Sequence, residues 1–350
     1  MEQVLIKSQE VAAITTAWEL AARGFSVIMA GHRKHRFLPL VLEEHTIALI
    51  DSIYGIRLHH DSRVHLLDRR EIRGWDSSSG VVDSKALSVS WSSLIDILRS
   101  RLKQCFATSV TWSSTSSETE NAIEFAIEAT GYNQNGLSFG QRVATLATVE
   151  THDRLSRCVI ERTCFGWAFL VLHGNRQATL FAFAADRKFD EEQVMNSTVS
   201  DYFATENLVL RENASAWRSC SPTLSHPLVT NQQILVGESA FTLDPICGDG
   251  VGYAVRSAVL AATVVADRSQ AEFRGHTYYV ARLRRAFSAH LTGCANVYAG
   301  WANGCWGNEL SATQRGVAYL SHQNMVHQSG KSIRRDQSRE PFTDLSMPTL

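Results

Sequence analysis

The stretch that decides the fold is Gly237-Glu238-Ser239-Ala240-Phe241-Thr242-Leu243-Asp244-Pro245-Ile246-Cys247-Gly248-Asp249-Gly250-Val251-Gly252-Tyr253-Ala254. It predicts a buried strand, a loop rich in proline and glycine, and then the first turn of a helix of small residues. The loop glycines Gly248, Gly250 and Gly252 let the backbone approach a ligand closely. The free N–H groups of a first helical turn carry partial positive charge, so the stretch predicts a pocket for an electron-rich or anionic ligand.

The composition is that of an ordinary globular protein. The chain has 350 residues, of which 44% are hydrophobic, and this length favours two subdomains. A net charge of -1 gives no general attraction to nucleic acid or anionic membranes. Its 7 cysteines are scattered without a Cys-x-x-Cys pair, which favours reduced thiols, and no metal-binding spacing is found. With no signal peptide or apolar spanning segment in the sequence, we expect a cytoplasmic protein without membrane or nucleic-acid partners.

The order of the expected elements predicts an α/β fold with one lobe inserted into another. Residues 4–6, 11–23 and 25–30 form a strand-helix-strand opening. A series of short strands then begins near residue 142. The expected parts are a discontinuous Rossmann-like domain of residues 1–141 and 226–270, an inserted β-sheet lobe of residues 142–225, a C-terminal helical region of residues 271–324, and a polar tail of residues 325–350 that we expect to be flexible.

The opening unit lacks the residues that bind a dinucleotide. In such units, three glycines after the first strand admit the diphosphate, and a carboxylate after the second strand binds ribose. Counting back from the end of the helix, the glycine positions fall on Ser8, Glu10 and Ala13, and the carboxylate position falls on about Gly31. Glu10 is the most damaging change, since one like-charge contact at about 4 Å costs roughly 4 kcal/mol, or about three orders of magnitude in affinity.

The 237–254 stretch resembles the flavin-contacting signature of the FAD-dependent monooxygenases of the p-hydroxybenzoate hydroxylase class. The order of elements further resembles the branch that contains tryptophan halogenases and the flavoproteins that mature tryptophylquinone cofactors. The other matching segments are Arg73-Gly74-Trp75, the helix near Ser92, Ala129-Thr130-Gly131, residues 161–183 and residues 298–306. The resemblance implies a Rossmann-like FAD-binding fold with an inserted β-sheet substrate lobe and a C-terminal helical region. The halogenase run Trp-x-Trp-x-Ile-Pro is absent, so we do not expect halogenation.

The resemblance also implies which residues contact the cofactor. They are Gly237, Glu238, Asp244, Pro245, Gly248, Gly250, Val251 and Gly252. Glu238 stands where the family has an aspartate that binds the ribityl hydroxyls, Asp249 adds a carboxylate beside the ring, and Ser92 stands where the family supplies an arginine. The positions that face the ring are kept in part, and those that face the ADP end are lost. Three outcomes stay open: weakly bound FAD, a smaller or transient flavin such as FMN or supplied reduced flavin, or no flavin.

Substrate-side candidates lie in the inserted lobe. His173, near a turn, could act as a base toward a phenol or indole, although a lone turn histidine is more often simply exposed. Alternating aromatic residues could line an aromatic substrate face or could be core packing; they are Trp167, Phe169, Phe181 and Phe183. The basic cluster at residues 32–36 could recruit a phosphate or an acidic peptide, or could be a solvated loop.

Two functions follow from these observations. The first is a flavin-dependent monooxygenase-like oxidoreductase that acts on an aromatic group of a small molecule or a partner protein, with weakened or altered flavin binding. The alternative is a flavin-free protein that serves as a binding or scaffolding protein on the same fold.

Overall fold

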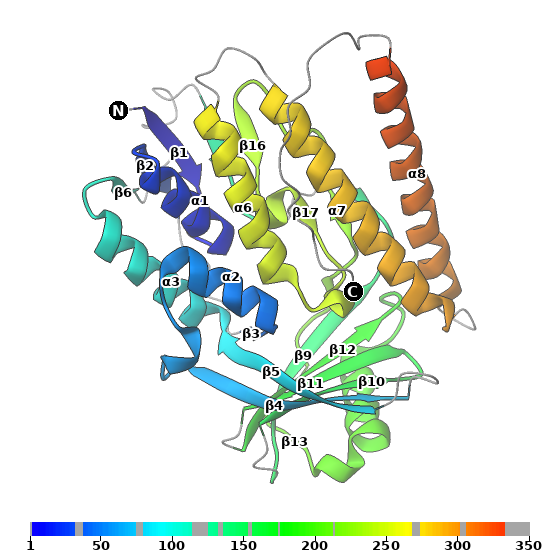
Figure 1. Cartoon of the computed structure of the whole chain (residues 1–350). Coiled ribbons are helices and arrows are strands. Elements are labelled where there is room, and N and C mark those ends of the chain that lie inside the picture. Colours follow the sequence, from blue (N-terminus) through cyan, green and yellow to red (C-terminus); the bar gives the residue numbers. More distant parts are fainter. Residues whose placement is uncertain are drawn as a thin grey trace.

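A computed structural model of the chain is shown in Figure 1. It describes residues 2–31, 38–74, 80–113, 125–131, 136–152, 156–173, 176–212, 214–267, 274–301 and 306–332. Within these ranges, none of the helices combines the length and the apolar character that crossing a membrane would require.

A parallel five-stranded sheet forms the first part of the molecule, in the order β16-β7-β1-β2-β6. Its strands are β1 (Gln3–Lys7), β2 (Ser26–Ala30), β6 (Val110–Ser113), β7 (Ala126–Glu128) and β16 (Gln233–Leu235). The helices that pack with it are α1 (Val11–Ala22), α3 (Trp91–Phe106) and α6 (Gly250–Ala266). Because β16 comes from a distant part of the chain and pairs with β7, the chain returns to this sheet just before the 237–254 stretch.

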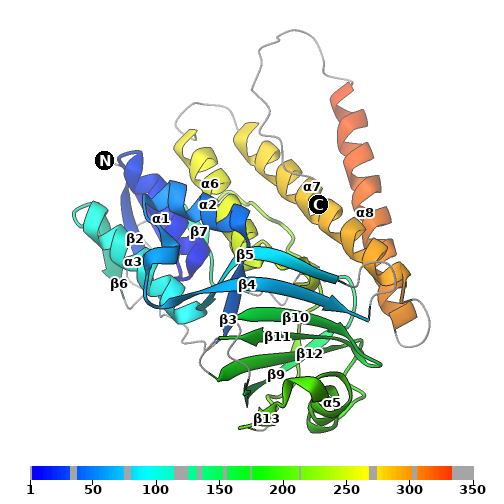
Figure 2. The ribbon, with the colours of Figure 1, turned by 60° about the horizontal axis from the view of Figure 1, so that its bottom comes forward.

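A second, nine-stranded sheet lies at the other end of the molecule (Figure 2). Its strands run in the order β13-β9-β12-β11-β10-β4-β5-β3, and β14 also pairs with β9. They are β3 (Pro39–Leu42), β4 (Val64–Arg73), β5 (Gly80–Ser90), β9 (Val143–Glu150), β10 (Arg157–Arg162), β11 (Gly166–Leu172), β12 (Gln177–Ala184), β13 (Val209–Leu210) and β14 (Arg218–Ser219). The expected strands β9 to β12 are present, whereas β3, β4 and β5 extend the sheet with earlier residues.

Charged residues hid β4 from the sequence analysis. Its second half reads Asp-Arg-Arg-Glu-Ile-Arg, which lacks an apolar alternation. In the structure, Glu71 and Arg73 of β4 form ion pairs with each other and with Arg157 and Glu206. Ion pairs within β4, with the neighbouring strand β10 and with the turn at Glu206 therefore take the place of apolar contacts on this face of the sheet.

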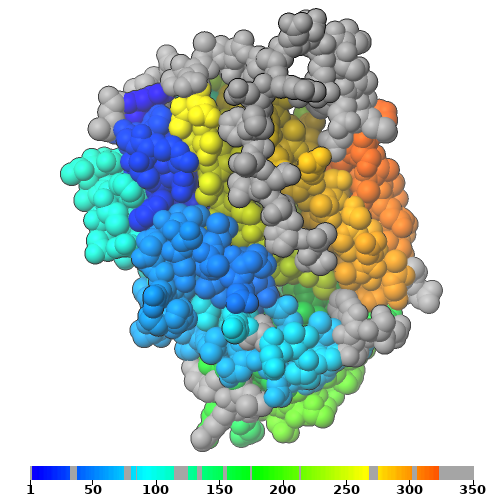
Figure 3. Space-filling view, in the orientation of Figure 1, coloured from blue at the N-terminus to red at the C-terminus, as the bar shows by residue number. Residues whose placement is uncertain are grey.

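Helix α2 (Glu44–Tyr54) lies between α6 and the strands β4 and β5 in the space-filling view (Figure 3). The spacing of apolar residues over 41–55 predicts one amphipathic helix, but Val41 and Leu42 at its beginning belong to β3. On the outer side of the second sheet lies the short helix α5 (Glu191–Ser197), followed by helical turns at Thr198–Tyr202 and Ala204–Glu206 (Figure 2). A small third sheet joins β8 (Leu137–Ser138), β15 (Thr223–Leu224) and β17 (Phe241–Thr242).

The C-terminal region is a pair of long helices, α7 (Arg274–Ala299) and α8 (Trp306–Ser332), which pack together (Figure 1). The expected tail began at residue 325, but α8 continues to Ser332. Residues 333–350 lie outside the described part of the chain.

Candidate functional site

The 237–254 stretch begins with a short 3-10 turn, Gly237–Ser239, rather than with the buried strand predicted from the sequence. Gly237 has a φ of 58°, which side-chain-bearing residues rarely adopt. A Cβ atom at this position would lie 2.6 Å from the Cβ of Ala12 in α1. Gly237 is therefore required for the close packing of this turn on α1, and Glu238 is exposed beside it.

Open space lies in front of the loop that precedes α6. Asp244 caps the turn Pro245–Cys247 by accepting a hydrogen bond from the Ile246 N–H at 3.0 Å. Gly248 follows with a φ of 65°. No described atom lies within 4 Å of the place that a Cβ would take at Gly248 or Gly250. The loop thus leaves room for a ligand at the N-terminus of α6, where the helix dipole favours negative charge.

The Asp249 carboxylate is directed toward α2 and Arg256. Its Oδ1 accepts a hydrogen bond from Thr46 Oγ1 at 2.6 Å and lies 3.3 Å from His45 Nε2, and its Oδ2 pairs with Arg256. Arg256 offsets the charge that the sequence analysis placed beside a flavin ring. A Cβ on Gly252 would lie 2.5 Å from Thr46 Oγ1. The missing side chain at Gly252 therefore lets α6 pack closely against Thr46 of α2.

A buried ionic cluster anchors this loop to the C-terminal helices. Arg142, which is 1% exposed, lies between Asp244, at 2.8 Å, and Glu309 of α8, at 3.0 Å. Tyr298 of α7 donates a hydrogen bond to Asp244 at 2.7 Å. The Asp244 carboxylate is therefore engaged inside the protein. Neither Arg142 nor Glu309 is predicted from the sequence, because nothing in either local sequence indicates that the other lies beside it.

Burial keeps two titratable side chains near the loop, His290 and Cys247, neutral. It lowers the pKa of His290 to about 4, and His290 Nε2 accepts the Asp244 backbone N–H at 2.9 Å. Burial likewise raises the pKa of Cys247 to about 12, so this thiol stays protonated. A protonated thiol is a poor nucleophile.

The dinucleotide positions of the opening unit lie together at the ends of β1 and β2. Ser8 is buried, and its Oγ accepts the Glu10 N–H at 3.1 Å. Gln9 Nε2 donates to the carbonyl oxygen of Gly31 at 2.6 Å, which links the two strand ends. Ala13 is fully buried against the core.

Glu10 occupies the N-terminus of α1. It is the N-cap residue and is 8% exposed, and its Oε2 accepts a hydrogen bond from Trp91 Nε1 at 2.5 Å. Trp91 and Ser92 are the first two residues of α3. Because Ser92 is uncharged, the position at which the family has an arginine brings no positive charge here. The residues present fit a flavin ring at the α6 end of the site, and they do not fit a diphosphate at the α1 end.

The aromatic residues of the inserted lobe are packed into a cluster with α7 and α8. Trp167 and Phe183 stack with ring centroids 3.8 Å apart. The buried aromatic members of this cluster are Trp167, Phe181, Phe183, Tyr298, Trp301 and Trp306, and the partly buried residues packed against them include Phe169 and Ile246. Since Ile246 belongs to the loop before α6, the cluster reaches the candidate site from the side of the second sheet.

His173 lies on the second sheet and is partly buried. Its Nδ1 is 3.2 Å from Ser88 Oγ and its Nε2 is 3.4 Å from Thr179 Oγ1. Burial and the nearby His65 lower its pKa to about 4, so the imidazole is neutral near pH 7. The basic cluster at residues 32–36 and Trp75 lie outside the described residues.

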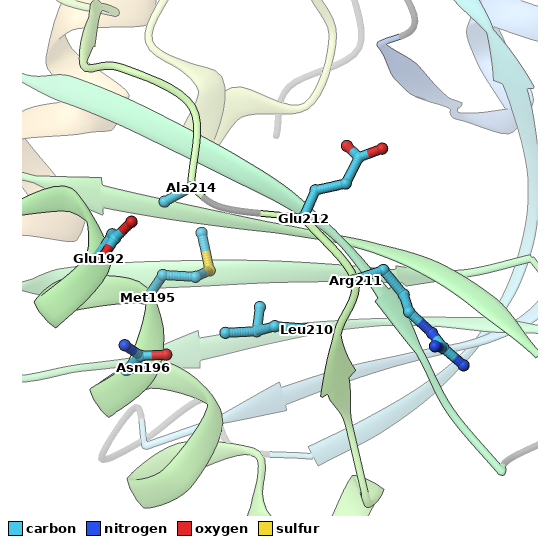
Figure 4. A pocket seen from close by; sticks show the side chains of 7 residues that line it. All are labelled: Glu192, Met195, Asn196, Leu210, Arg211, Glu212 and Ala214. Atoms are coloured by element: carbon cyan, nitrogen blue, oxygen red, sulfur yellow. The ribbon is translucent and has the colours of Figure 1, made fainter.

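A separate cavity of about 160 Å³ lies between α5 and β13, on the outer side of the second sheet (Figure 4). Its lining residues are Glu192, Met195, Asn196, Leu210, Arg211, Glu212 and Ala214. The loop before α6 lies toward the other side of this sheet, so the cavity is separate from the candidate site (Figure 2).

Comparison with known proteins identifies the fold. No family model matches the sequence, and no curated protein matches it. Among solved structures, the chain is similar to the peptidyl tryptophan dihydroxylase QhpG, essential for tryptophylquinone cofactor biogenesis, with 15% identity, a TM-score of 0.72, and coverage of 89% of this chain and 78% of that one. It is similar to the flavin-dependent brominase Bmp2, with 14% identity, a TM-score of 0.69, and coverage of 94% and 99%. It is also similar to the p-nitrophenol 4-monooxygenase PnpA from Pseudomonas putida DLL-E4, with 12% identity, a TM-score of 0.65, and coverage of 96% and 100%.

These likenesses confirm the predicted fold. The chain has the α/β fold shared by flavin-dependent monooxygenases and halogenases, with a parallel sheet and a second curled sheet. All three neighbours are enzymes by title, so they give the flavin-free scaffold alternative no support.

Proposed function

We propose that this protein is a flavin-dependent oxidoreductase of the monooxygenase type, acting on an aromatic group. The observation that carries the proposal is the open space beside Gly248 and Gly250, at the start of α6, in a fold that flavin-dependent enzymes share. A helix N-terminus favours an electron-rich ring, and reduced flavin is such a ring. The flavin, when bound, supplies the electrons and the oxygen activation for the reaction.

The chain's own residues position the ring and exclude water. The ion pair with Arg256 reduces the repulsion between the Asp249 carboxylate and a negatively charged ring. Arg142 holds the Asp244-Pro245 turn in place through its buried ion pair. Ile246 and the aromatic cluster form an apolar wall on the side of the second sheet, which keeps water from the reacting face.

Residues 1–141 and 226–270 form the flavin-binding part in this proposal, residues 142–225 the substrate lobe, and residues 271–324 a helical cover. The substrate is an aromatic small molecule or an aromatic side chain of a partner protein. The likeness to a dihydroxylase that acts on a peptidyl tryptophan supports the second of these. The scattered cysteines support a cytoplasmic location.

An absorbance spectrum of the purified protein tests the proposal, followed by titration with riboflavin, FMN and FAD. Flavin absorption bands, or saturable quenching of at least one added flavin, are expected. A colourless protein that quenches none of the three would overturn the proposal. Oxygen uptake with supplied reduced flavin, in the presence and absence of an indole-bearing peptide, then tests turnover.

A further inference from the structure

Two side chains close the α1 end of the candidate site. Glu10 and Trp91 are each 8% exposed, and their hydrogen bond of 2.5 Å joins the N-terminus of α1 to the N-terminus of α3. The adjacent bond from Gln9 to Gly31 spans the ends of β1 and β2. These two hydrogen bonds therefore occupy the place that a phosphate group would have to enter.

The Glu10 carboxylate also places a negative charge at the start of α1. A helix N-terminus attracts anions, and here a carboxylate of the chain itself stands at the N-cap position, bonded to Trp91 Nε1. A phosphate group placed at this helix start would lie beside the carboxylate or would have to break its bond to Trp91. Either route weakens the binding of ligands that carry phosphate, while a ligand with an uncharged tail meets no such repulsion.

We propose that Glu10 and Trp91 select against phosphate, so that the site accepts a flavin with an uncharged ribityl tail, riboflavin, in preference to FMN and FAD. This inference rests on the proposed flavin function. The ring binds beside Gly248 and Gly250, and the tail ends before the first turn of α1. Glu10 is a specificity-determining residue in this account, and Trp91 positions it.

Flavin fluorescence quenching at neutral pH tests this selection with riboflavin, FMN and FAD as probes. We expect the full-length protein to bind riboflavin on the order of a hundredfold more tightly than FMN or FAD. Glu10→Gln keeps the size of the side chain and removes its charge. It should tighten FMN and FAD binding by about tenfold or more and leave riboflavin binding within about twofold, because only the phosphates feel the charge.

Two further variants keep the test decisive. Glu10→Gly removes both charge and volume, and it should favour FMN and FAD even more than Glu10→Gln does. Glu19→Gln removes one negative charge from the other end of α1, where Glu19 pairs with Arg23, and should change none of the three affinities. A circular dichroism spectrum of each variant verifies that it is folded.

The outcomes separate this inference from the proposed function. Equal affinity of the unaltered protein for FAD and riboflavin overturns the inference and leaves the flavin function intact. Equal improvement of all three flavins in Glu10→Gln also overturns it, because that result assigns Glu10 a general structural effect. Failure of every variant to bind any flavin overturns the flavin function and the inference together.

Discussion

The N-termini of α1 and α6 each carry an acidic N-cap residue, and the two carboxylates are held in different ways. Asp249 of α6 turns away to Thr46, His45 and Arg256, and open space remains beside the preceding glycines. Glu10 of α1 is buried against Trp91. An acidic residue at the same helical position therefore leaves one helix start accessible and closes the other.

This difference shows that a helix N-terminus is an anion site only when the chain leaves it open. The glycines of the α6 loop serve two purposes, since Gly248 leaves space while Gly237 and Gly252 permit packing against α1 and α2. At α1, by contrast, the glycine positions are the buried residues Ser8, Glu10 and Ala13, and Ser8 Oγ accepts the Glu10 N–H. In the proposed function, the candidate site therefore binds the flavin ring and has no place for a diphosphate.

The largest expected effect concerns the anchor of the α6 end. Arg142→Met leaves Asp244 and Glu309 buried without their cation, which should lower the free energy of unfolding by about 3–5 kcal/mol. Urea denaturation measures this change. Arg211→Met, which removes an exposed arginine paired with Glu150, is the matched control and should have little effect. Similar midpoints for both variants would show that Arg142 does not anchor the loop.

The stability of the α6 end should also depend on pH through His290. Its pKa is about 4 in the folded protein against the ordinary value of 6.5, so between these pH values the unfolded chain binds a proton that the folded chain does not. Stability should therefore fall by roughly 3 kcal/mol as the pH drops across this window. Urea midpoints measured from pH 7 to pH 4 test this.

His290→Gln is the variant that isolates this effect. It should flatten the slope of stability against pH, although His173, whose pKa is also about 4, leaves part of it in place. If the slope of stability against pH is unchanged in His290→Gln, His290 binds its proton in the folded protein with an ordinary pKa near 6.5.

The open space at the α6 end can be filled directly. Gly250→Leu introduces a side chain where no described atom lies within 4 Å, so folding should be unaffected. Riboflavin affinity should fall by about tenfold or more, equivalent to roughly 1.4 kcal/mol, because the side chain takes the place of the ring. Gly80→Leu, at an equally open position in β5, is the control. Unchanged affinity in Gly250→Leu would place the ring elsewhere.

The smallest expected effect concerns the contact between α2 and α6. Thr46→Val keeps the shape of the side chain and removes the hydrogen bond to Asp249, which Arg256 continues to hold. We expect a loss of about 1 kcal/mol in the free energy of unfolding. Thr292→Val, on the exposed surface of α7, serves for comparison and should change stability little. Equal losses of stability in the two variants would show that the hydrogen bond from Thr46 to Asp249 does not stabilise the contact between α2 and α6.

The sequence predicted most of the fold because its main elements carry local signals. The apolar runs of β1 and β2, the strands β9 to β12 and the small-residue helix α6 all follow from periodicity and from glycine positions. Strand β4 was missed, since its charged residues Glu71 and Arg73 also pair with the distant residues Arg157 and Glu206, which no local pattern reveals.

The candidate site was predicted less completely, because its closing contacts join distant residues. Glu10 stood out as a misplaced charge, but its partner Trp91 is 81 residues away and gave no signal. The same holds for Arg142 and Glu309, and for the contact of Thr46 with Asp249. Tertiary packing decides such pairs, and a pattern of periodicity and spacing contains no information about them.

The most direct test of the account is a crystal structure of the protein grown with both riboflavin and FAD. It should show an isoalloxazine ring beside Gly248 and Gly250, an intact contact between Glu10 and Trp91, and no phosphate at the first turn of α1. A complete FAD with its diphosphate at that turn would contradict the account.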